Sequence, residues 1–192
     1  MADGFTISAQ GLTEAQQHMA QRAARMRNLA PALRVVAAEI EQRTDDAFRD
    51  SKSPYGELWP KLAPSTLLSR AAKLPGAKRT GKAGGLTKGA QRKREKAISA
   101  YNAGTGGIFK PLVDTGRMRG SVRVRVRGNE LEFAAVGYMA PHITGSLSRP
   151  GRPPKRNPTV FQRAASGELM AIPSILALLL RTVSRYVQTG QV

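Results

Sequence analysis

One stretch of strict alternation constrains the fold of this chain more than any other feature. Between residues 121 and 137, apolar residues alternate with charged ones on both sides of a Gly-Asn dipeptide, and the apolar set is Val122, Val124, Val126, Leu131 and Phe133. A period of two is typical of a β-strand with one buried face. Gly128-Asn129 is a favoured two-residue hairpin turn. The sequence therefore predicts an antiparallel hairpin at 121–137 whose apolar face packs on a core.

Pairing the two strands across this turn sets their register. The predicted partners are Val124 with Phe133, Val126 with Leu131, Arg125 with Glu132 and Arg127 with Glu130. One face is then wholly apolar, and the other carries pairs of opposite charge worth roughly 0.2–1 kcal/mol each. A slip by one residue would destroy both patterns, so the register is strongly specified. Val124 and Phe133 are the expected fold anchors of this hairpin.

Helical periodicity marks both ends of the chain. Residues 12–50 carry apolar side chains at intervals of three and four, behind a capping box of Thr13 and Gln16. Pro31 lies inside this pattern and lacks an amide donor, so it should kink the helix or start a second one. After Pro173, residues 174–187 form an amphipathic helix with one apolar stripe: Ile175, Leu176, Leu179, Leu180, Val183 and Tyr186. The order of elements predicts an α+β fold.

Positive charge is concentrated in one part of the chain. The 192 residues have a formal net charge of +18, yet residues 1–69 hold eight basic and eight acidic side chains. Residues 70–127 hold sixteen basic and two acidic side chains. Such a segment attracts polyanions through counterion release and long-range steering. A solvated, lysine-rich loop is the plainer interpretation.

Two basic segments are expected to extend from the core. Residues 70–110 mix glycines with lysines and arginines, which predicts a long basic insertion loop with a short helix at about 88–101. Residues 141–158 hold five prolines among basic residues, which predicts an extended arm. The candidate residues for facing a protein partner or DNA are Lys88, Arg92, Lys93, Arg94, Arg149, Arg152, Lys155 and Arg156.

Residues with catalytic or metal-binding chemistry are few and scattered. The chain has no cysteine, which excludes disulfides, thiolate metal sites and a cysteine nucleophile. Its two histidines, His18 and His142, have no acidic cluster nearby in the sequence. Asp45 and Asp46 are helical neighbours and point to different faces. No nucleophile-elbow serine or phosphate-binding loop is present. We therefore expect no enzyme, no cofactor and no metal.

Membrane insertion is not expected either. The longest apolar run covers residues 175–180, far short of the ~20 residues of a membrane span. Residues 1–5 carry neither the basic nor the apolar region of a secretory signal.

Two turn-rich segments carry further candidate fold anchors. Residues 51–60 are rich in turn formers, and Trp59 and Leu62 are expected to anchor that loop on the core. In residues 114–116, the Asp114 side chain is expected to bond a local backbone amide and Gly116 to take a left-handed conformation. We interpret these residues as making the fold rather than an interface.

Several motifs follow the N-terminal helical region in a fixed order. They are GELWPKLAPST at 56–66, LVDTGRMRGSV at 112–122 and the strand at 133–138, with the basic insertion between the first two. Residues 138–145 and the Pro-Arg-rich segment 149–158 follow. Together they resemble the phage virion morphogenesis (tail completion) family, the last two segments only loosely. The resemblance covers most of residues 12–160.

This resemblance implies a fold and a function. It implies a single tail-completion-like domain over residues 1–192, and a structural virion protein at the head–tail junction that is needed to join tail and head. The protein would be a tail completion protein, a tail terminator or a neck ring. Its implied partners are copies of itself in a ring, with six-fold symmetry favoured, head connector or neck proteins, and tail tube or terminator proteins. It would be made in the host cytoplasm and located in the virion, where contact with packaged DNA is an option.

A second class of function stays open. A basic nucleic-acid-binding protein would use residues 70–127 on phosphates. Against it, the first 69 residues are neutral overall, and Tyr101 and Phe109 are the only aromatic residues near the basic run. Few aromatic side chains are therefore available to stack on the bases of a single-stranded nucleic acid.

Overall fold

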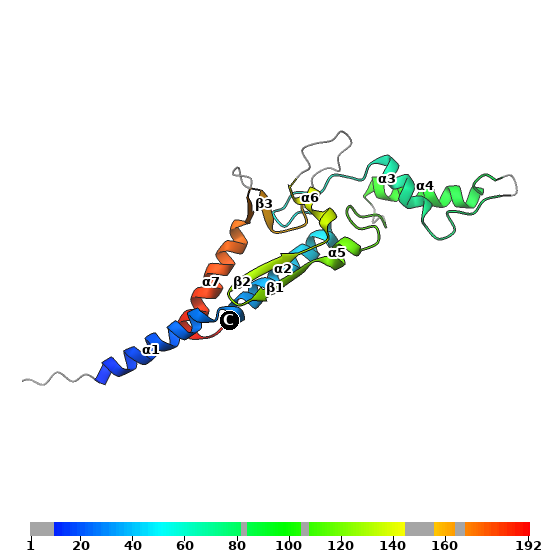
Figure 1. Cartoon of the computed structure of the whole chain (residues 1–192). Helices are drawn as coiled ribbons and strands as arrows, with labels where there is room; N and C mark the ends of the chain where they lie inside the picture. The colour runs from blue at the N-terminus through cyan, green and yellow to red at the C-terminus, as the bar shows by residue number, and fades with distance from the viewer. Residues whose placement is uncertain (1–9, 82–83, 105–107, 145–155, 164–167) are drawn as a thin grey trace, which may run out of the picture. The chain divides into compact units, whose positions relative to one another are not determined.

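The computed structural model describes residues 10–81, 84–104, 108–144, 156–163 and 168–192 (Figure 1). Within these residues the fold is mixed α+β, with seven α-helices and two antiparallel sheets of two strands each. In chain order the elements are α1 (Gln10–Arg27), α2 (Ala30–Asp50), α3 (Pro64–Ala72), α4 (Lys88–Ala103), α5 (Arg117–Ser121), β1 (Arg123–Arg127), β2 (Glu130–Ala134), the short 3-10 helix η1 (Gly137–Met139), α6 (Ala140–Thr144), β3 (Phe161–Arg163), β4 (Leu169–Ala171) and α7 (Pro173–Thr189). None of the described helices is both long enough and apolar enough to cross a bilayer.

The chain forms two compact units, and the division between them falls within α2. The first unit combines Met1–Glu41 with Arg123–Ala134 and Ala171–Val192. The second combines Gln42–Val122 with Ala135–Met170. Each unit is therefore built from segments that are distant in the sequence.

In the first unit, the N-terminal helical region is broken at Asn28 and Leu29. Pro31 is the second residue of α2, so it starts a new helix, one of the two outcomes expected for it. The Asn28 side chain accepts a hydrogen bond from the Ala30 amide at 3.3 Å. From the hairpin turn, Asn129 Oδ1 accepts one from the Leu29 amide at 2.9 Å. The break is thus held by side chains that bind the amide of Ala30, the first residue of α2, and the amide of Leu29 just before it.

The hairpin prediction is confirmed in its register. Val124 pairs with Phe133, Arg125 with Glu132, Val126 with Leu131 and Arg127 with Glu130. Gly128 has φ +57°, as the first position of a type II′ turn requires. The strands are shorter than predicted, because β1 begins after Val122 and β2 ends at Ala134.

The burial and charge pairing of the hairpin differ from the expectation in detail. Its apolar face is only half-buried, whereas the sequence predicted a face packed fully on the core. Arg127 forms its ion pair diagonally, with Glu132 at 3.1 Å. Long side chains reach such diagonal neighbours across an antiparallel pair.

The C-terminal helix α7 begins at Pro173, as predicted, and ends at Gly190, which has φ +80°. The predicted apolar stripe is only partly buried. Ile175 is 2% exposed, but Leu176 and Leu180 are 39% and 69% exposed, and Thr182 is buried instead. The helix therefore presents apolar side chains on two sides, of which the first unit covers one.

In the second unit, the helix predicted at about 88–101 is confirmed as α4, whereas the insertion around it packs on an apolar cluster and does not extend from the core as a loop. Helices α3 and α4 lie side by side (Figure 1), and a buried apolar cluster of Leu62, Leu67, Ala71 and Phe109 joins them. Leu74, Ala97, Ile98 and Tyr101 pack against this cluster. Lysines and glycines obscured the apolar spacing in the sequence, and α3 was not predicted at all.

The prediction of an extended arm at 141–158 is also wrong at the two ends that the structure describes, residues 141–144 and 156–158. Residues 140–144 form helix α6, with Pro141 in its first turn. Residues 156–160 are buried in the second unit. Asn157 Oδ1 accepts hydrogen bonds from the Thr159 amide and hydroxyl at 2.9 and 2.8 Å, and Asn157 Nδ2 donates to the Phe161 carbonyl. This local network satisfies the polar groups that burial would otherwise penalise.

Candidate interface surfaces

Helices α3 and α4 and the loop that joins them are called the α3–α4 hairpin below. This hairpin carries a basic patch, defined as Lys78, Arg79, Lys88, Arg92, Lys93 and Lys96. All six side chains are exposed, and none forms an ion pair with a described residue. On α4, Lys88, Arg92 and Lys96 follow one another at intervals of four residues, so they lie along one side of the helix. The single acidic residue of α4, Glu95, accepts a hydrogen bond from Gln91 Nε2 at 3.2 Å.

Two hydrogen bonds hold the loop before α4, and the Lys93 side chain lies close to it. The Thr87 amide donates to the Arg79 carbonyl at 3.0 Å, and Arg94 Nε donates to the Ala77 carbonyl at 2.9 Å. The Lys93 ammonium lies 3.9 Å from the place where a Cβ on Gly76 would sit. Lys78 and Arg79 are therefore positioned close to the cations of α4.

Other cations of α3 and α4 bind groups of the chain itself, and one of them is Arg94, a predicted interface residue. Arg94 is half-buried and holds the Ala77 carbonyl, so it is not a free surface group. Arg70 Nη1 donates to the carbonyls of Lys110 and Val113 at 2.6 and 3.0 Å. Lys73 Nζ binds Asp114 Oδ2 at 2.6 Å.

Arg156 was predicted to lie on an exposed arm, and this prediction is wrong. The residue is 6% exposed. Its Nε donates to the Pro60 carbonyl at 3.0 Å and its Nη2 to the Lys61 carbonyl at 2.9 Å. Burial lowers the pKa of the Arg156 guanidinium. The other predicted arm residues, Arg149, Arg152 and Lys155, lie outside the described residues.

The predicted anchors of the loop after α2 are buried. Trp59 and Leu62 are each 7% exposed. The Trp59 ring packs edge-on against Phe48, with centroids 5.8 Å apart. The Leu62 amide donates to the Tyr101 hydroxyl at 2.7 Å. Three residues thus hold residues 59–62 in place. They are Phe48 of α2, Tyr101 of α4 and Arg156, which binds the carbonyls of Pro60 and Lys61.

The turn at 114–116 differs from the prediction at one residue. Gly116 has φ +75°, the predicted left-handed conformation. Asp114 binds Lys73 at 2.6 Å and lies 3.7 Å from Arg70 Nε, whereas we expected a local backbone amide as its partner. The Lys73 hydrogen bond, with Arg70 nearby, lowers the pKa of Asp114. This carboxylate joins its turn to α3, about forty residues earlier in the chain.

Helix α1 presents an apolar stripe that no described side chain covers. Leu12, Met19 and Met26 are 61%, 72% and 60% exposed. They recur every seven residues and therefore lie close to one line along the helix. The C-terminal end of α1 is bound to α7 through a different side chain. Arg25 Nη1 donates to the carbonyls of Val187 and Gln188 at 3.2 and 3.1 Å. The sequence placed these residues at helical spacing, and the structure leaves their side chains exposed.

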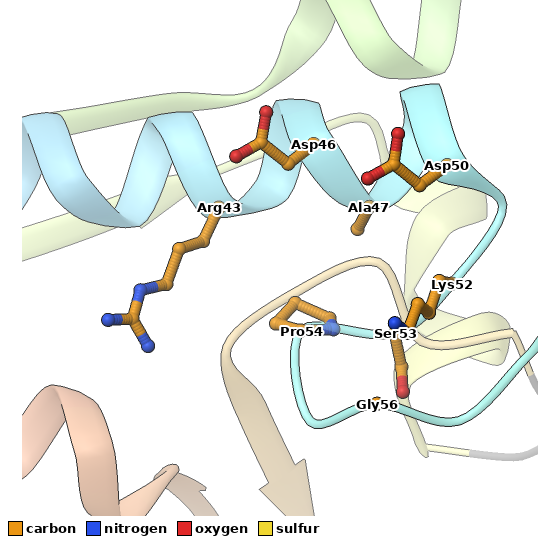
Figure 2. A pocket seen from close by; sticks show the side chains of 8 residues that line it. All are labelled: Arg43, Asp46, Ala47, Asp50, Lys52, Ser53, Pro54 and Gly56. Atoms are coloured by element: carbon orange, nitrogen blue, oxygen red, sulfur yellow. The ribbon is translucent and has the colours of Figure 1, made fainter.

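A hollow of about 270 Å³ lies where α2 passes into the following loop (Figure 2). Arg43, Asp46 and Asp50 line it from the helix, and Lys52 and Ser53 line it from the loop. Both carboxylates already bind Arg49, at 2.7 and 3.1 Å. Ser53 Oγ accepts a hydrogen bond from the Glu57 amide at 3.0 Å. The two carboxylates and the serine hydroxyl of this hollow therefore already have partners within the chain.

The described residues contain no group of three or more His, Asp or Glu side chains placed to hold a metal ion. Asp45, which the sequence placed on a different face from Asp46, binds Arg119 Nη2 at 2.7 Å. The sequence offered no signal for that pair, because the two residues lie 74 positions apart. Its effect is to tie α5 to the end of α2.

No protein-family model, no curated protein and no solved structure matches the chain.

Proposed function

We propose that this protein is a structural subunit of a homo-oligomeric ring at the head–tail junction of a tailed phage. The observation that carries the oligomer is the exposed stripe of Leu12, Met19 and Met26 on α1. Contiguous apolar surface of this kind marks interaction sites in proteins. The location at the junction rests on the sequence motifs that resemble the tail completion family.

The partner that fits the α1 stripe is another copy of the chain. An apolar side chain at every seventh residue fills one of the two heptad positions through which α-helices pack along each other. At 1.5 Å per residue, the 18 residues of α1 give a helix of about 27 Å. When such contacts repeat head to tail and the rotation closes, they generate a ring.

A structural role also fits how the polar side chains are used. Five cations bind carbonyls or carboxylates of the chain itself: Arg70, Lys73, Arg94, Arg119 and Arg156. The proposal therefore includes no catalytic site, cofactor or metal. Head connector or neck proteins and tail tube or terminator proteins would be its neighbours.

Native mass spectrometry of the purified protein tests the oligomer. The wild type should form a closed oligomer, and Met19→Glu should be monomeric because a charge at the centre of the stripe would be buried without a partner. Gln17→Glu is the matched control, since it adds the same charge on another side of the same helix. A wild type that stays monomeric, or a Met19→Glu variant that assembles normally, would count against the proposal.

The location is tested in phage particles. A phage that lacks this protein should accumulate separate heads and tails in negative-stain images, and the wild-type protein should restore joining. Normal particles in its absence would remove the proposed role at the junction.

A further inference from the structure

We propose that the basic patch of the α3–α4 hairpin binds the phosphate backbone of duplex DNA without reading its sequence. This inference rests on the proposed function, because packaged DNA passes through the head–tail junction.

Three cations of α4 form a row that a polyanion can bind. Lys88, Arg92 and Lys96 are separated by about 6 Å of helix rise at each step. Lys78 and Arg79 are held near the same helix by the Arg79–Thr87 and Ala77–Arg94 hydrogen bonds. Duplex DNA carries one charge per about 1.7 Å of its axis with both strands counted, so a 12 Å length of duplex holds about seven phosphates. The patch therefore matches a dense, regular array of negative charge.

The surroundings of the row favour phosphate over an acidic protein. Between residues 88 and 99, the exposed positions of α4 hold no apolar side chain; they are Lys88, Gly89, Gln91, Arg92, Lys93, Glu95, Lys96 and Ser99. Protein–protein interfaces have cores enriched in aromatic residues, Met and Arg, and depleted of Lys and Glu. This side of α4 lacks such a core, whereas contacts to phosphate need only positioned cations and polar groups.

The supply of aromatic residues favours a duplex over a single strand. Proteins that hold single strands stack exposed aromatic side chains on the bases. Phe109 is buried, and Tyr101 packs against it with centroids 6.4 Å apart. The Tyr101 hydroxyl is already bound by the Leu62 amide. Neither ring is free to stack on a base, so the patch is suited to the outside of a duplex.

The helix that carries the row is held in place before any ligand binds. The Thr87 side chain caps its start by accepting from the Ala90 amide at 3.3 Å. Ala97, Ile98 and Tyr101 pack on the apolar cluster shared with α3. A phosphate backbone would thus meet cations whose backbone positions are already set, which lowers the ordering cost of binding.

Salt-dependent binding to a labelled random-sequence duplex, followed by fluorescence anisotropy, tests this inference. The test variant is Lys88→Gln, Arg92→Gln, Lys96→Gln. The matched control is Arg34→Gln, Arg181→Gln, Arg185→Gln, which removes the same net charge from exposed positions of the first unit. The slope of log K against log salt is negative, and each lost phosphate contact should reduce its magnitude by about 0.9. The magnitude for the test variant should therefore fall by about 2.7, and that for the control should hardly change.

Three results would overturn the inference. The first is a wild type that does not bind the duplex. The second is an equal loss of salt slope in the two triple variants. The third is a test variant that binds DNA normally but no longer binds a virion protein. If the test variant does not fold, Arg92→Gln alone should still reduce the magnitude of the slope by about 0.9. Native mass spectrometry reads the oligomer separately, so a failed ring and a failed DNA contact are distinguishable.

Discussion

Arg156 is a cation buried among backbone carbonyls. Within the described residues its guanidinium contacts no carboxylate; it holds the carbonyls of Pro60 and Lys61. Desolvation of a charge is costly unless hydrogen bonds compensate for it, and the planar guanidinium can meet two acceptors at once. Its position explains why the segment next to Trp59 is ordered although it lies outside any helix or strand.

Arg156→Ala should destabilise the protein by about 1.5–3 kcal/mol for each hydrogen bond lost. Arg156→Lys should recover little, because an ammonium does not reproduce the two-point geometry. Urea unfolding followed by circular dichroism measures the change. Arg92→Ala, at an exposed position, is the control and should stay within about 0.5 kcal/mol of the wild type. An Arg156→Ala variant as stable as the wild type would contradict this account.

Asp45 should make the stability of the protein depend on pH in the acidic range. The hydrogen bond from Arg119 holds the pKa of Asp45 below its ordinary value. A carboxylate with a lowered folded-state pKa contributes stability above its unfolded value of about 3.9, and loses it as the pH falls through the folded value. Both side chains are about half exposed, so the effect is small.

The gap in urea midpoint between the wild type and Asp45→Asn should be constant from about pH 7 to pH 5 and close below about pH 4. Arg119→Gln should show the same gap and the same closure. The double variant should be no less stable than either single variant, since the two residues act through one interaction. A gap that persists unchanged at low pH would exclude the ion pair as its source.

At the scale of elements, the break between α1 and α2 depends on the hairpin. Asn129 Oδ1 accepts from the Leu29 amide at 2.9 Å, and Asn129 Nδ2 donates to the Arg27 carbonyl at 3.4 Å. At the other end of the hairpin, the Val124 amide donates to Glu41 Oε1 at 2.8 Å. The hairpin therefore lies along the first half of α2, and its turn residue caps that helix.

Asn129→Ala should lower the free energy of unfolding by about 0.5–2 kcal/mol, the usual value of a lost helix cap. Asn129→Asp keeps the acceptor for the Leu29 amide and loses the donor to Arg27, so it should lose less. Chemical denaturation of the three proteins gives the comparison. Equal stability of the alanine variant and the wild type would show that the turn side chain does not support α2.

At the scale of the whole molecule, α2 contributes to both compact units. Residues up to Glu41 belong to the first unit and those from Gln42 onward to the second. Leu33, Val36 and Ile40 are buried in the first half, and Phe48 is buried in the second. One helix thus supplies core residues to two units, while the apolar stripe of α1 belongs to neither core.

If copies of the chain cover that stripe, thermal stability should depend on concentration. Association of folded subunits stabilises them by mass action, so the Tm should rise by about 2–4 °C for each tenfold increase in protein. Differential scanning fluorimetry over a hundredfold range measures this. The Tm of Met19→Glu should not change with concentration, and a wild-type Tm that is equally constant would argue against self-association.

The elements with local signals could be predicted from the amino-acid sequence. The register of β1 and β2, the new helix at Pro31 and the start of α7 at Pro173 all follow from periodicity and turn chemistry within a few residues. Only the tertiary structure decided which side chains those elements bury. Arg156 acts on carbonyls about 95 positions away, Asp45 on an arginine 74 positions away, and α3 packs on an apolar face of α4 that lysines obscured. Burial and pairing depend on what a distant segment places beside a residue, and a local pattern carries no information about that neighbour.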